Sequence, residues 1–141
     1  MRFGIVLIFS LLFLGSAIAQ TEFAKFSIGE KKYEVKIDDN IVASMSMGET
    51  VMLSATDGQG TSVTTMVPAQ VGEYKATGGF TSPMLTITLS ASDVYNLKTG
   101  NITITKVEGK TYTGSFKGEV MLIGEEQAQK ASGTFSITLD M

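Results

Sequence analysis

Three groups of side chains in this sequence have the chemistry to bind something: carboxylates in turn-like segments, closely spaced methionines, and stripes of hydroxyls. The carboxylates stand in Asp38-Asp39-Asn40 and in Asp57-Gly58, where oxygen ligands in a turn suit Ca²⁺. Neither segment fits the twelve-residue calcium loop, and Asp and Asn also form turns without an ion. We therefore predict no metal site at either segment.

The methionines Met45 and Met47, together with Met52 and Met66, carry soft thioether sulfur of the kind that binds copper. Met45 and Met47 are two residues apart, so they share one face of a strand predicted over residues 41–47. Methionine also fills irregular gaps in hydrophobic cores. Core packing is the interpretation favoured by the sequence, and no metal ligand or cofactor is predicted.

Hydroxyl side chains alternate with apolar ones along several segments, which places the hydroxyls on one strand face. Such a face suits contact with carbohydrate or with ice, although Thr is also well suited to any half-exposed strand. The stripes are Thr86-x-Thr88, Thr103-x-Thr105, Thr111-x-Thr113 and Thr134-x-Ser136-x-Thr138.

Enzymatic chemistry is disfavoured by the residue types that the chain lacks. With Cys 0 and His 0, disulfides, thiolate zinc sites and catalysis by an imidazole or a thiol are excluded. The chain has no S-x-x-K spacing, so a pair of carboxylates is the remaining option, and sequence does not show their separation. We predict a non-enzymatic protein without catalytic residues, and its binding residues stay unassigned.

Residues 1–19 have the pattern of a secretory signal peptide. Arg2 supplies the positive charge, residues 3–14 are almost wholly apolar, and small residues 15–19 end in an A-x-A site. A helix of the apolar stretch spans about 18 Å, short of a bilayer core of ~30 Å. We predict cleavage before Gln20, no membrane span after cleavage, and a secreted or periplasmic protein.

The charge of the chain limits the classes of partner that it is expected to bind. The formal net charge is −3, and Arg2 is the only arginine, so nucleic-acid binding is not expected. The predicted partner is an unknown protein or glycan.

The rest of the chain, residues 20–141, is predicted to form a single all-β domain, because apolar and polar residues alternate throughout. One helical turn is expected at 92–95 with Ser92 as its cap. Eight or nine short strands joined by Gly-rich turns predict an antiparallel β-sandwich, with a small β-barrel as the alternative. The expected strands are 26–28 and 33–37 as a hairpin, 41–47, 51–56 and 61–67 around Asp57-Gly58, 85–89, 102–105, a long strand at 111–123, and 132–139. A short extended piece is expected at 72–76.

A small-Gly-hydroxyl-Phe pattern occurs twice, as TGSF at 113–116 and SGTF at 132–135. We expect two neighbouring strands that press Phe116 and Phe135 into one core, with each glycine leaving room for a ring from across the sheet.

These segments also resemble a family of small secreted bacterial envelope domains with the pattern G-x-I-x-I-T … G-[ST]-F-x-G … G-T-F. GNITIT at 100–105 and the two repeats carry the resemblance, which spans about residues 26 to 139. Members are often lipoproteins, and no function is assigned to the family. The resemblance implies an all-β fold and a bacterial envelope origin, but this chain lacks the lipidated cysteine.

The function expected from the sequence is a non-enzymatic secreted or periplasmic interaction domain, or an accessory domain of the envelope. Two alternatives stay open: a barrel that holds a small apolar ligand, and a carbohydrate-binding module.

Overall fold

The computed structural model describes residues 22–37, 44–79 and 81–139, and its secondary structure is entirely β. Within these residues there is no helix long and apolar enough to cross a membrane. The strands are β1 (Phe23–Ile28), β2 (Lys31–Val35), β3 (Met45–Met47), β4 (Thr50–Thr56), β5 (Ser62–Pro68), β6 (Gly72–Lys75), β7 (Met84–Thr88), β8 (Val94–Glu108), β9 (Thr111–Leu122) and β10 (Ala128–Thr138).

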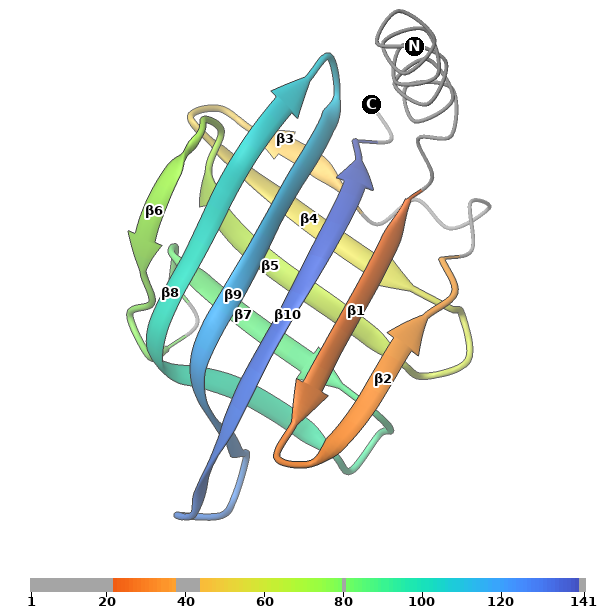
Figure 1. Cartoon of the computed structure of the whole chain (residues 1–141), viewed down its shortest axis with the longest axis vertical. Coiled ribbons are helices and arrows are strands. Elements are labelled where there is room, and N and C mark those ends of the chain that lie inside the picture. The colour runs from red at the N-terminus through yellow and green to blue at the C-terminus, as the bar shows by residue number, and fades with distance from the viewer. Residues whose placement is uncertain (1–21, 38–43, 80, 140–141) are drawn as a thin grey trace, which may run out of the picture.

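One antiparallel sheet contains all of these strands. Its order is β2-β1-β10-β9-β8-β7-β5-β4-β3, and β6 pairs with β8 beside this path. The sheet curls into a half-barrel, in which β1, β10 and β9 cross in front of β4, β5 and β7 (Figure 1). The long strand β8 joins the two layers, since its start pairs with β7 of the back layer and it pairs with β9 of the front layer from Tyr95 to Glu108. The all-β, antiparallel prediction is confirmed.

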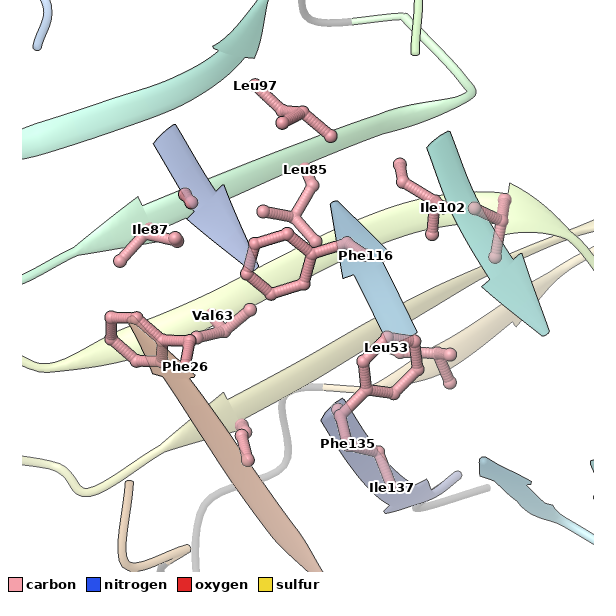
Figure 2. Packing of buried hydrophobic residues seen from close by; sticks show 14 of the residues in the cluster. Phe26, Leu53, Val63, Leu85, Ile87, Leu97, Ile102, Phe116, Phe135 and Ile137 are labelled. Carbon is pink, nitrogen blue, oxygen red and sulfur yellow. The ribbon is translucent and has the colours of Figure 1, made fainter. Parts of the chain in front are cut away.

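A single hydrophobic core fills the space between the two layers. Phe26, Phe116 and Phe135 of the front layer pack with residues such as Leu53 and Leu85 of the back layer (Figure 2). The regular alternation of buried and half-buried residues in β4 and β5 explains why these segments form strands with one face in the core. Full burial of each such side chain contributes about 1.5–3 kcal/mol.

The two repeated segments lie side by side on β9 and β10, as predicted. Phe116 pairs with Gly133 and Phe135 pairs with Gly114, and both rings are buried. The expectation that neighbouring strands press these rings into one core is confirmed.

The helical turn predicted at 92–95 is wrong. The backbone N–H of Asp93 donates to the carbonyl of Ser90, which closes a turn, and Val94 and Tyr95 already belong to β8. β8 is also much longer than the predicted strand 102–105. Register shifts between Leu97 and Thr99 interrupt the alternation, so this part of the strand has no period-two signal.

Several other predictions are confirmed, and some concern residues that lie partly or wholly outside the described residues. The β1–β2 and β4–β5 hairpins and the short strand β6 form where expected. The described residues form ten strands rather than eight or nine. The long strand predicted at 111–123 is confirmed as β9, whereas β10 begins at Ala128, earlier than the predicted 132. The signal peptide, Asp38-Asp39-Asn40 and the first part of the strand predicted at 41–47 lie outside the described residues.

Candidate functional site

Three of the four predicted hydroxyl stripes meet on the outer face of β8, β9 and β10. The hydroxyls of Thr111 and Thr138 are 2.8 Å apart, and those of Thr113 and Ser136 are 3.3 Å apart. The fourth stripe, Thr86 and Thr88, lies on β7 in the other layer. The antiparallel register therefore converts separate sequence stripes into a two-dimensional hydroxyl array.

The array continues onto β1, where the Ser27 hydroxyl lies 3.4 Å from that of Ser132. Lysines flank this pair, because Lys32 on β2 is opposite Ser27 and Lys117 on β9 is opposite Ser132. On β8, Asn101 is opposite Lys117. Hydroxyl and amide side chains thus face both lysines across the strands.

Two shallow depressions lie over these strands and share Ser27 and Ser132 in their linings. Their volumes are about 590 Å³ and about 390 Å³. We call the combined feature the β1–β10 groove. Its lining residues are Lys25, Phe26, Ser27, Gly29, Lys32, Tyr33, Glu34, Lys117, Gly118, Glu119, Lys130, Ala131, Ser132, Gly133 and Thr134.

The groove is locally basic within an acidic protein. Its lining contains four lysines and two glutamates, whereas the whole chain carries a net charge of −3. Glu34 is opposite Lys25 and Glu119 is opposite Lys130, so these carboxylates are placed to offset two of the four ammonium charges. The charges of Lys32 and Lys117 have no carboxylate directly across the strands and give the middle of the groove its positive character.

Aromatic side chains lie beneath the groove, on the core-facing side of the β1–β2 hairpin, since Phe26 is buried while its neighbours Lys25 and Ser27 are on the outward face. The rings of Phe26 and Tyr33 are stacked, with centroids 5.1 Å apart. Lys25 extends its ammonium over the ring of Phe23, 5.9 Å from the centroid. The stacked rings join β1 to β2, and the Lys25–Phe23 contact lies within β1.

The carboxylate of Asp57, considered above as a calcium ligand, stabilises the turn in which Asp57 lies. Its Oδ1 accepts hydrogen bonds from the backbone N–H groups of Gln59, at 2.7 Å, and Thr61, at 3.2 Å. The Gln59 bond is the main reason why the pKa of this carboxyl is lowered. Among the described residues, no three Asp or Glu side chains gather in a way that could hold a metal ion.

The prediction that the methionines fill the core is wrong. Met45, Met52 and Met66 are half-buried and outside the core cluster, and Met47 is 50% exposed. Strand alternation explains this result, because Val51 and Leu53 point into the core and leave Met52 on the outer face.

The lysines of the groove were not among the site residues predicted from the sequence. A weak signal exists, since Lys25 and Lys117 stand two residues from Ser27 and Ser115 and therefore share the outward face with them. Only the register shows that they come together. No family model, curated protein or solved structure matches this chain.

Proposed function

We propose that this protein is a non-enzymatic binding domain, secreted or periplasmic, that holds an anionic glycan in the β1–β10 groove as an accessory of the bacterial envelope. The observation that carries the proposal is that the two depressions share Ser27 and Ser132 in their linings, with Lys32 and Lys117 on either side of this pair.

The chemistry of the groove matches a sugar polymer that bears carboxylates. Serine and threonine hydroxyls donate and accept hydrogen bonds, as the hydroxyls of sugars do. Lysine is a mobile point charge, so it attracts carboxylates without requiring one fixed geometry. A shallow groove across several strands also suits an extended chain better than a small, enclosed ligand.

The finer description of the fold belongs to the same proposal. We propose that the curled sheet is a β-sandwich. The support for this is that the core cluster contains residues from both layers. The alternative, a barrel that holds a small apolar ligand, has less support. The residues that would line its cavity, such as Leu53, Leu85 and Phe135, are at most 1% exposed and pack against one another.

Calorimetric titration of residues 20–141 with polygalacturonate, and with neutral dextran for comparison, tests the proposal. We expect binding to polygalacturonate only, weakening as the ionic strength is raised to about 0.15 M, where the Debye length is ~8 Å. The double variant Lys32→Gln and Lys117→Gln should bind about fivefold to thirtyfold more weakly, since each exposed ion pair contributes at most ~1 kcal/mol.

The matched control is Lys110→Gln. Lys110 is an exposed lysine in the turn just before β9, roughly 23 Å from Lys117 at ~3.3 Å per residue. Its loss should leave the affinity unchanged. Equal binding of dextran, no binding of either polymer, or an equal effect of the control variant would refute the proposal.

A further inference from the structure

Methionines form a row across the outer face of the back layer. The register places Met45 opposite Met52, Met52 opposite Met66, and Met66 opposite Met84. These residues come from β3, β4, β5 and β7, which are adjacent in the sheet (Figure 1). We call this set the methionine row.

The row lies outside the core and is still partly accessible. Met45, Met52 and Met66 are half-buried. Met84 is only 6% exposed, yet it is not part of the core cluster. Three of the four methionines are therefore partly accessible on the outer face of the sheet.

The spacing of the row suits a shared ligand. Residues directly opposite each other on antiparallel strands have Cβ atoms about 4.5–5.5 Å apart. Methionine has three rotatable side-chain bonds, so its sulfur can adjust its position without movement of the backbone. Met52 stands between Met45 and Met66, and the three sulfurs can converge on one point above β4.

The surrounding surface favours a soft cation. The outward residues of β4, β5 and β7, strands that the structure describes in full, include no charged side chain, so none of these three strands brings an ammonium group to the row. They also include no carboxylate or imidazole, the ligands that hard and borderline divalent ions use. The remaining outward residues are Thr50, Ser54, Thr56, Ser62, Thr64, Pro68, Thr86 and Thr88.

We propose that the methionine row binds a soft monovalent cation of the Cu(I) class through the thioether sulfurs of Met45, Met52 and Met66, with Met84 at the flank. Thioether ligands select Cu(I) over oxygen-seeking cations such as Ca²⁺ and Mg²⁺. The site lies in the back layer, on strands other than those that line the β1–β10 groove, so it does not depend on the glycan proposal.

The test is an anaerobic titration of residues 20–141 with Cu(I) against a competing chelator, repeated with Ag(I), which has similar ligand preferences and does not change oxidation state. We expect binding of a single ion per chain, with only sulfur ligands in the X-ray absorption spectrum. Met52→Leu keeps the apolar volume. It should weaken binding at least about tenfold, because loss of even a supporting group at a metal site costs this much.

The control is Met121→Leu, on β9, where Met121 is half-buried and lies opposite Asn96 rather than a methionine. Its affinity for Cu(I) should equal that of the wild type, and both variants should keep the wild-type melting temperature. The proposal fails if neither ion binds, if Met52→Leu binds as well as the wild type, or if nitrogen or oxygen ligands dominate the spectrum.

Discussion

Phe135 on β10 lies directly opposite Gly114 on β9, and a Cβ atom added to Gly114 would stand only 2.8 Å from Cζ of the phenylalanine ring. The relationship is reciprocal. Gly133 lies opposite Phe116, and its added Cβ would be 2.7 Å from Cε1 of that ring. Each ring therefore occupies the space left by a glycine, which has no side chain, on the neighbouring strand. The repeated small-Gly-hydroxyl-Phe pattern thus allows β9 and β10 to pack closely in the front layer.

The first prediction concerns Gly114→Ala. The new methyl group would also meet the backbone carbonyl oxygen of Thr103 at 2.3 Å, so β8 or β9 has to shift. We expect a loss of about 1–3 kcal/mol in the free energy of unfolding, the usual cost of overpacking. Denaturant unfolding measures it. Gly79→Ala is the matched control, because Gly79 has open space and no positive φ, and its effect should stay within about 0.5 kcal/mol.

The second prediction is that Phe116→Ala or Phe135→Ala lowers the free energy of unfolding by about 3–5 kcal/mol, because each creates a cavity in the core. The rings are 3% and 1% exposed. Val71, at 59% exposed, provides the comparison, and Val71→Ala should change stability by no more than about 0.5 kcal/mol. Losses below about 1 kcal/mol for both phenylalanines would contradict the assigned core.

These two predictions rest on the part of the structure that the sequence predicted best. Alternation and turn residues predict hairpins well, since both signals are local, as in β4 and β5 around Asp57. The start of β8 was missed because a register shift after Leu97 removes the alternation. The methionines were assigned to the core because the pattern shows that Met45 and Met47 share a face without showing which face is buried.

The candidate site was harder to predict for a different reason. Lys32, Ser27, Ser132 and Lys117 come from four strands, and Ser27 and Ser132 are neighbours only because β1 pairs with β10 at the far end of the chain. Such pairing depends on the topology of the whole sheet. Local sequence patterns carry no information about it.

The third prediction is a pH dependence at Asp57. Hydrogen bonds from the backbone lower the pKa of this carboxyl, so the ionised form is favoured in the folded protein. The stability that it contributes is present above the pKa of the unfolded chain, about 4. It is lost as the pH falls through the lower folded value. Denaturant midpoints should therefore fall more steeply with acid in the wild type than in Asp57→Asn, and parallel curves would contradict this assignment.

The fourth prediction is that the exported protein begins at Gln20. Residues 3–14 and the A-x-A site at 17–19 match the pattern that signal peptidase recognises. Intact mass of the protein recovered outside the cytoplasm measures the cleavage position directly. Replacement of Ala17 and Ala19 by bulkier residues should block processing, and an exported form that keeps residues 3–14 would contradict the prediction.

The fifth prediction is that Ca²⁺ and EDTA leave the melting temperature unchanged. The Oδ1 atom of Asp57 is already engaged by the N–H groups of Gln59 and Thr61, so a cation would have to compete with the turn for this carboxylate. A specific site saturated at about 100 times its dissociation constant adds ~2.7 kcal/mol. In a domain of this size that corresponds to a rise of roughly ten degrees. Thermal melts with added Ca²⁺ and with EDTA separate the outcomes clearly. A rise that disappears in Asp57→Ala would show that the turn opens to take the ion, and one that disappears in Asp38→Ala would place the site at Asp38-Asp39-Asn40.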